Sequence, residues 1–323
     1  QLTAQRVLPL LDARDEALRL AALDVLNRRA NWAEDVAALF DQWLGGGRVS
    51  EPRLQVLAGA LPKLMANERV AAVAGRMLSR WKTDPATCKA ALAAIPQASK
   101  LKLPESWQKP IEESLACREG DLAADSIGAI AALKTDRFDA QLRQISADGQ
   151  MPALLRIKAM DAMAARAGAL NEGSFDMLVQ QMNPKVPSAT RAEASHLLSK
   201  ASLTKPQLLG LTRLVASVGP LELPLLLGAF NQSRDKEVGA ALVAVLTNSA
   251  AGGTLKAAEV QKLFQRFPAE VRDRAKPMVD ELVAQAEVHF QPRVHGDFVL
   301  DEEAPLIRGV VDVDMERKGI DIP

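Results

Sequence analysis

The chain has 323 residues, with 40 basic and 40 acidic side chains and a formal net charge of zero. Balanced charge provides no bulk field that would concentrate nucleic acid or an anionic membrane surface, so neither is favoured as a partner. Hydrophobic residues make up 48% of the chain, but aromatic residues only 4% and Tyr is absent. Such a composition favours an aliphatic core in which small side chains let many helices stack closely.

An amphipathic segment recurs along the chain and opens on an arginine or on a residue in the equivalent position. Its starts lie at Arg19, Arg53, Cys88, Ala123, Arg156, Arg191 and Leu226. Successive starts are 34, 35, 35, 33, 35 and 35 residues apart. A period of this length, with helical periodicity inside each unit, predicts a solenoid of stacked helix pairs. We therefore expect an all-α superhelix of about seven pairs over residues 14 to 249.

Each unit shows the pattern of a helix hairpin with one buried side. In the first unit, one face of the first helix is expected to bury Leu20, Leu23 and either Val25 or Leu26. The second helix has apolar residues at i, i+3, i+4, i+7 and i+8: Val36, Leu39, Phe40, Trp43 and Leu44. The same pattern returns in later units, as in Val70, Val73 and Met77, and again in Phe138, Leu142 and Ile145.

Capping signals indicate where helices begin. Asp84 precedes Pro85, which predicts an N-cap carboxylate followed by a first-turn proline. Two segments match the capping box, in which a hydroxyl and a side chain three residues later satisfy free N–H groups: Thr190 to Glu193 and Thr204 to Gln207. The glycine triplet at 45–47 is predicted to be a turn, because neither a strand before it nor a Gly-Lys-Ser/Thr motif after it marks a phosphate loop.

Three regions follow from these patterns. Residues 1–254 form the repeat array, and residues 255–290 are expected to supply two helices that cap its exposed end. Residues 291–323 lose the helical period and form a short tail with one or two β-prone strands, such as 306–314. Residues 297–323 hold eight acidic and three basic side chains, a net charge of −5 that leaves +5 for the rest of the neutral chain. Tail and body are thus electrostatically complementary.

The repeats resemble HEAT (armadillo-like) repeats over most of the chain. The segment Ser217 to Ser249 (SVGPLELPLLLGAFNQSRDKEVGAALVAVLTNS), followed by Val260 to Leu282, also resembles the helical region of planctomycete-type membrane-bound dehydrogenase-like proteins. In that family a propeller-like domain precedes the repeats and a c-type cytochrome domain follows them. The resemblance implies a bacterial, periplasmic or secreted electron-transfer protein. Without it, the compartment does not follow from the sequence, which begins at Gln1 as expected of a processed or excised piece.

The haem part of that family has no counterpart here. Covalent haem attachment needs C-x-x-C-H, whereas Cys88 is followed by Lys-Ala-Ala and Cys117 by Arg-Glu-Gly. We therefore expect no cofactor in this chain, and interpret it as a spacer or docking part of such a protein. Both cysteines are predicted to be small hydrophobic residues. The apolar runs, such as 238–246, fall well short of the roughly 18 residues of a membrane span.

One group of residues has metal-ligand chemistry. His289, His295, Asp312 and Asp314 could combine imidazole and carboxylate ligands, with Asp297 nearby, because side chains two apart on a strand point the same way. Their spacing matches no known loop, and a D-x-D pair on a solvated strand is common. They are candidate ligands, but we expect no metal. His196 falls on the polar face of its helix and is assigned no role.

The recurrent arginines Arg19, Arg53, Arg156 and Arg191 provide the strongest site signal. Each guanidinium could bridge carboxylates of adjacent repeats, such as Asp15, Glu16 and Glu51, and fix their stacking. The alternative is a basic stripe for an acidic partner or nucleic acid, which the interleaved acidic residues disfavour. The four tryptophans, at 32, 43, 81 and 107, are expected to be core wedges rather than a base-stacking platform.

Three functions remain open from the sequence. The leading hypothesis is a non-enzymatic HEAT-like scaffold, a docking or spacer module within a larger protein, whose partner is another protein or an adjacent domain. The second is an enzyme on a HEAT-like scaffold, such as a DNA-repair glycosylase or a bilin lyase. A glycosylase would need a basic concave groove with an exposed Trp and a carboxylate. The third is haem-associated electron transfer through a neighbouring domain.

Overall fold

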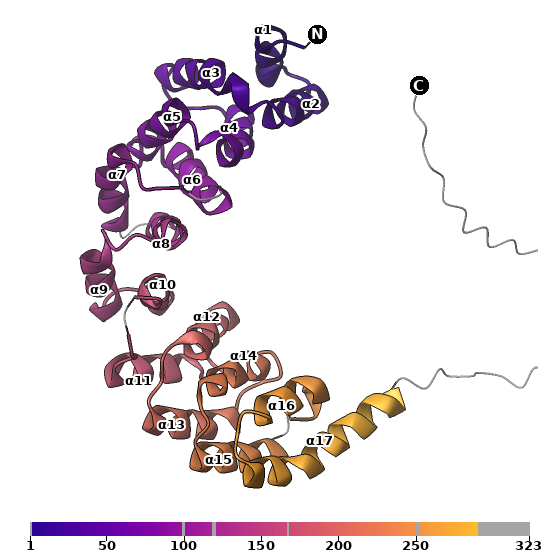
Figure 1. Cartoon of the computed structure of the whole chain (residues 1–323). Helices are drawn as coiled ribbons and strands as arrows, with labels where there is room; N and C mark the ends of the chain where they lie inside the picture. The colour runs from indigo at the N-terminus through magenta and orange to yellow at the C-terminus, as the bar shows by residue number, and fades with distance from the viewer. Residues whose placement is uncertain (1, 99–100, 118–120, 167, 250–251, 290–323) are drawn as a thin grey trace, which may run out of the picture.

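In the computed structural model the chain folds into an arc of helix pairs (Figure 1). The structure describes residues 2–98, 101–117, 121–166, 168–249 and 252–289, with side chains up to residue 285. Among these residues there are helices and one isolated β-bridge, between Ala169 and Ser202, but no strand. The all-α solenoid predicted from the repeat is therefore confirmed. No described helix is both long and apolar enough to serve as a membrane span.

The helices form two rows. The A row lines the inner side of the arc in Figure 1 and the B row its outer side. The A row consists of α2 (Glu16–Asn27), α4 (Glu51–Leu64), α6 (Pro85–Ala94), α8 (Leu122–Leu133), α10 (Ala153–Met163), α12 (Ser188–Lys200), α14 (Leu223–Leu227) and α16 (Ala257–Phe264). The B row consists of α3 (Ala33–Gly45), α5 (Glu68–Leu78), α7 (Glu105–Leu115), α9 (Asp139–Ala147), α11 (Glu172–Gln181), α13 (Lys205–Val215), α15 (Lys236–Thr247) and α17 (Ala269–His289).

Short helical pieces complete the array. Before the first pair stand α1 (Ala4–Val7) and the 3-10 helix η1 (Leu8–Asp12), which pack on α2 and α4. Further 3-10 turns are η2 (Ala30–Trp32), η3 (Ile95–Gln97), η4 (Gly228–Gln232) and η5 (Gly252–Thr254). From α2 to α14, each A helix packs against the next A helix. The stack is thus continuous along the inner side of the arc.

The helices begin where several of the local signals predict. The Asp84 side chain caps α6 by accepting a hydrogen bond from the Thr87 backbone N–H. Thr204 and Gln207 form the reciprocal capping box of α13. The apolar pattern of the B helices is also confirmed, because Val36, Phe40, Val70, Val73 and Met77 are fully buried. Sequence periodicity therefore identified the core side of this row.

Two expectations about the A row are wrong in detail, and the A helix of its seventh unit is shorter than the others. Thr190 is not an N-cap: α12 already begins at Ser188, directly after Pro187, so Thr190 lies in its first turn and is buried. Leu20 is 53% exposed, because α2 is rotated so that Arg19, three residues before Ala22, faces inward. In the seventh unit the A helix is only α14, five residues long and continued by the 3-10 turns of η4.

The last pair, α16 and α17, closes the described part of the array. α17 packs against both α16 and α15. It approaches α15 at Gly239, where an added Cβ would lie 2.6 Å from the Phe267 ring and 2.8 Å from Val271. Two helices were predicted in this region. The domain boundary at residue 254 stays a prediction, and the tail, residues 291–323, lies outside the described residues.

Candidate functional site

Two of the recurrent arginines bridge neighbouring repeats. Arg53 on α4 makes a bidentate contact with Asp12 of η1, in which Nε lies 2.8 Å from Oδ1, and its guanidinium stacks over the Trp43 ring at 5.3 Å. Arg191 on α12 donates from Nε to Glu222 of the next repeat at 2.8 Å, and Glu222 is buried. The hydrogen bonds and charge of Arg53 hold the pKa of Asp12 below its ordinary value.

The other two arginines bind backbone carbonyls that precede their own helix, in the loop before α2 for Arg19 and in the last turn of α9 for Arg156. Arg19, itself buried, donates to the carbonyls of Ala13 and Arg14 at 2.9 and 3.2 Å. Arg156 donates from Nε to the carbonyl of Ser146 at 3.0 Å. The guanidinium fork therefore satisfies the open carbonyls of the preceding turn, and Arg191 does the same with the carbonyl of Val186 at 2.7 Å.

The expected carboxylates differ from those observed. Asp12 and Glu222 accept the bridging bonds, whereas Asp15 caps α2 by accepting from the Leu18 N–H. The residues that make the contacts are separated by 41 positions for Arg53 and 31 for Arg191. At this recurring helix position, Arg53 and Arg191 therefore bridge to carboxylates of a neighbouring repeat, Arg156 binds the last turn of the preceding helix, and Arg19 binds the loop before its own helix. The stacking role itself stays a prediction that substitutions can test.

The third repeat is linked to its neighbour by other side chains, because Cys88 occupies the position of the recurrent arginine. The buried Asp84 carboxylate accepts from the Val49 N–H of the preceding repeat at 3.2 Å and from the Thr87 hydroxyl at 2.6 Å. Burial alone would raise the pKa of Asp84, but these hydrogen bonds, with the nearby Arg48, hold it below its ordinary value. Arg80 donates to the carbonyls of Leu44 and Gly47, again one repeat back. Sequence reasoning found the Asp84 cap but not these bridges.

Further ion pairs link successive B helices on the outer side. Arg69 pairs with Glu34 at 3.0 Å and Arg76 with Asp41, which ties α5 to α3. Near the other end, Lys205 of α13 pairs with Asp235 and Glu237 at the start of α15. Lys236 of α15 pairs in turn with Glu270 of α17. Their spacing of about one repeat is a signal that could have revealed them, since opposite charges recur one period apart.

The tryptophans belong to the core. Trp32, Trp43 and Trp107 are buried, as predicted for wedges. The indole N–H of Trp107 donates to the carbonyl of Ala71 at 2.7 Å, which joins α7 to α5. Trp81 is half-buried and donates to Glu113 at 3.0 Å. Three of the four rings are therefore covered by protein rather than available for base stacking.

Many of the accessible side chains of α4, α6 and α8 are small, although α4 also exposes Glu51, Gln55 and Lys63. The small ones include Ala58, Gly59, Ala90, Ala93, Ala124, Gly128, Ala131 and Ala132. Single charges interrupt this surface, among them Lys89 on α6 and Asp125 on α8. Partial burial raises the pKa of Asp125, an effect that Lys89 and Lys158 on either side oppose. We call this face, formed by the accessible residues of α4, α6 and α8, the inner surface.

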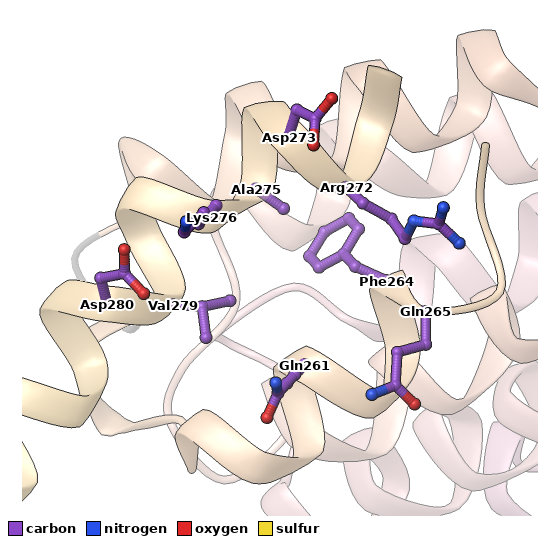
Figure 2. A pocket seen from close by; sticks show the side chains of 9 residues that line it. All are labelled: Gln261, Phe264, Gln265, Arg272, Asp273, Ala275, Lys276, Val279 and Asp280. Atoms are coloured by element: carbon purple, nitrogen blue, oxygen red, sulfur yellow. The ribbon is translucent and has the colours of Figure 1, made fainter. Parts of the chain in front are cut away.

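A pocket of about 290 Å³ opens between α16 and α17 (Figure 2). Figure 2 shows the Phe264 ring between the two helices, with Gln261 and Gln265 on one side and Arg272 and Lys276 on the other. Asp273 and Asp280 also line it, so acids and bases are balanced at its rim. Its residue types provide no nucleophile with a paired base.

The remaining candidates are placed as follows. His196 is exposed, as expected of the polar face of its helix. Burial raises the pKa of the Cys88 thiol to about 12, so at neutral pH it is a protonated core residue. His295, Asp297, Asp312 and Asp314 lie outside the described residues, and so does the side chain of His289 at the end of α17. In the part of the chain that is described, no three His, Cys, Asp or Glu residues are grouped to hold a metal ion.

No protein-family model and no curated protein matches the chain. Among solved structures, the crystal structure of an engineered protein from the Northeast Structural Genomics Consortium is similar over 88% of this chain and 98% of its own. The sequence identity is 15% and the TM-score 0.23, too low to support an argument about function. The fold class therefore rests on the helix pairs themselves, and any functional conclusion must come from the surfaces that they present.

Proposed function

We propose that this chain is a non-enzymatic HEAT-like scaffold, a docking or spacer module that belongs to a larger secreted protein of the dehydrogenase or cytochrome type. The observation that carries the proposal is the continuous arc, in which successive A helices pack on one another and line one side (Figure 1). Stacked helix pairs of this kind expose an extended concave surface, which is the part that solenoids commonly use for binding.

The inner surface supports a docking role through its small side chains. Ala90, Ala93 and Gly128 leave the helix backbones of α6 and α8 accessible to close approach. An added Cβ at Gly128 would meet no atom within 4 Å, so open space lies next to it. A protein segment can lie close to such a surface and bury main-chain and methyl groups together.

The use of arginine supports a structural rather than a charge-based role. Arg53 and Arg191 are engaged by Asp12 and Glu222, and Arg19 is buried against carbonyls. Guanidinium groups held in this way stiffen the stack and are not presented as a free basic stripe. The proposal therefore assigns recognition to shape and apolar contact on the inner surface.

Site-specific photo-crosslinking in the source organism tests the docking surface. A photoreactive residue at Ala93 or Ala132, on the A row, should form one defined adduct, whereas the same residue at Ala38 of α3, on the B row, should not. Gly128→Arg should abolish the adduct without changing the helical circular-dichroism signal, because its side chain projects into open space. Equal adducts from both rows, or an adduct that survives Gly128→Arg, would contradict the proposal.

The link to a larger protein has a separate test. The coding sequence on either side should specify a propeller-like domain upstream and a C-x-x-C-H cytochrome domain downstream. The chain by itself, expressed with haem-maturation machinery, should show no stoichiometric Soret absorption. Flanking sequence of unrelated type would remove the dehydrogenase and cytochrome part of the proposal and leave the docking module standing.

A further inference from the structure

The buried apolar side chains form two separate core clusters that meet at α10. The first runs from α1 to α10, where it includes Ala159, Ala162 and Met163. The second begins on the same helix with Ile157 and Met160 and runs to α17. A solenoid core is normally continuous, since each repeat buries the face of the next. α10 is therefore a boundary between two packed bodies, here called the N-terminal half and the C-terminal half.

The two rows behave differently at this boundary. On the inner side α10 packs against α12, as elsewhere in the A row. On the outer side the contact between α9 and α11 is at most slight, whereas α3–α5, α5–α7, α11–α13, α13–α15 and α15–α17 pack more extensively. The polar link at this step comes from the loop between α10 and α11, where Arg166 makes a bidentate contact with Asp139 of α9, its Nη2 lying 2.7 Å from Oδ1. The A row is therefore packed continuously across the boundary, whereas the B row is packed only loosely there.

A pocket of about 210 Å³ occupies the loosely packed side of the boundary. Ser146 lies at the end of α9, Ser174 lies on α11, and Met160 and Met163 of α10 are among the other lining residues. Five of the nine methionines of the chain fall between residues 151 and 182, namely Met151, Met160, Met163, Met177 and Met182. Methionine side chains are unbranched and adaptable, so they keep contact while the surrounding elements shift.

The neighbouring step from α7 to α9 provides a contrast. These helices are also not closely packed, but Gln141 donates to Glu112 at 2.8 Å and Arg137 to Gln108 at 3.3 Å. Leu115 of α7 and Leu142 of α9 also belong to one core cluster. That step has a shared core, whereas the buried core residues of α9 and α11 that the structure describes belong to different clusters.

We infer that the α10–α12 contact is a hinge, and that rotation about it opens and closes the Met-lined pocket between α9 and α11 and so changes the curvature of the arc. The polar bridge along this hinge is the ion pair of Asp161 on α10 with Lys200 on α12, at 2.5 Å. Two bodies joined along a single line of contact can rotate with little loss of buried surface. The inference is independent of whether the inner surface docks a partner.

Pulsed electron paramagnetic resonance on the full chain tests the hinge. Spin labels at Ala140 and Ala244 span three B-row steps across the boundary, from α9 to α15, and labels at Gln42 and Ala140 span three steps within the N-terminal half. All three sites are exposed, and the background carries Cys88→Ala and Cys117→Ser, checked by its unfolding temperature. We expect the distance distribution across the boundary to be about twice as broad as the matched one. Equal widths would overturn the hinge.

A variant that fills the pocket between α9 and α11 provides a second test of the hinge. Ala164→Leu adds volume to the pocket between α9 and α11 and should narrow the α9–α15 distribution. Ala116→Leu is the matched control, because Ala116 lines the pocket between α7 and α9, and it should leave that distribution unchanged. If Ala164→Leu leaves the width unaltered, or if both variants narrow it equally, the α9–α11 pocket is not the moving element.

Discussion

The N-terminal and C-terminal halves have the same helix-pair architecture but set the register between repeats by partly different side chains. In the N-terminal half, arginine and tryptophan reach one repeat back, as in the bonds of Arg80 to Leu44 and of Trp107 to Ala71. In the C-terminal half Arg266 also donates one repeat back, to the Asn231 carbonyl at 3.0 Å, but glutamine amides do so as well: Gln207 donates to the Leu170 carbonyl at 2.8 Å and Gln232 to the Ala201 carbonyl at 3.0 Å. A recurring backbone arrangement therefore needs a donor at the turn, but not one particular side chain.

The comparison is tested most strongly by removing one large core side chain from each half. Phe40 and Phe230 are both fully buried, the first in the N-terminal and the second in the C-terminal core cluster. Phe40→Ala and Phe230→Ala should each lower the unfolding free energy of their own half by about 3–5 kcal/mol. Hydrogen exchange measured by mass spectrometry should show faster exchange in one half only. An equal loss of protection in both halves would show that the array unfolds as one unit.

The next largest losses of stability are expected from removing the arginine bridges. Glu222 is buried, so Arg191→Ala leaves a carboxylate without its partner and should cost about 2–4 kcal/mol in the C-terminal half. Arg53→Ala should cost only about 1 kcal/mol, because the Asp12 side chain is 45% exposed and solvent screens the pair. Arg156→Ala removes one bond to a carbonyl and should also cost about 1 kcal/mol.

Chemical denaturation of these variants ranks their losses of stability directly. Arg28→Ala is the control, because Arg28 pairs with Asp24 within its own helix and its side chain is 76% exposed. It should shift the midpoint very little. If Arg191→Ala also leaves the midpoint in place but abolishes binding of an acidic ligand, the arginines serve recognition and not stacking.

Acid should weaken the N-terminal half through Asp84. Because its folded pKa is lowered, ionised Asp84 contributes stability above the unfolded value near 4, and this contribution is lost as the pH falls through the folded pKa. Asp84→Asn should therefore destabilise by about 1–2 kcal/mol at pH 7, and the difference from the parent chain should shrink below pH 4. Denaturation midpoints at pH 7 and pH 3 check this. A difference that is the same at both pH values would assign the effect to shape and not to charge.

The smallest effect is expected from the tail. Deletion of residues 291–323 should leave the helical circular-dichroism signal and the unfolding of both halves nearly intact, because those residues lack the helical period. In the full chain their hydrogen exchange should be fast relative to the central repeats. Collapse of the C-terminal half on truncation would place the tail inside the core of that half.

The sequence predicted the architecture better than it predicted the side-chain contacts. Periodicity located the helix pairs, since burial on one side of a helix imposes a spacing of three and four residues. It missed that Arg19 faces inward and Leu20 outward, because a buried guanidinium bound to carbonyls has no sequence signature. The boundary at α10 was equally hidden. It depends on which helices of neighbouring repeats come into contact, and the spacing of 35 residues from Arg156 to Arg191 lies within the range of 33 to 35 found along the whole array.

The position of the tryptophans has a consequence for optical measurements. All four indoles lie between residues 32 and 107, in the N-terminal half, and the chain has no tyrosine. Fluorescence excited at the red edge of the indole band therefore reports on one half alone, while far-ultraviolet dichroism averages over both. A melting curve recorded by emission and one recorded by dichroism are two different experiments on this molecule. Any difference between the two midpoints measures how independently the C-terminal half, which has no indole, unfolds.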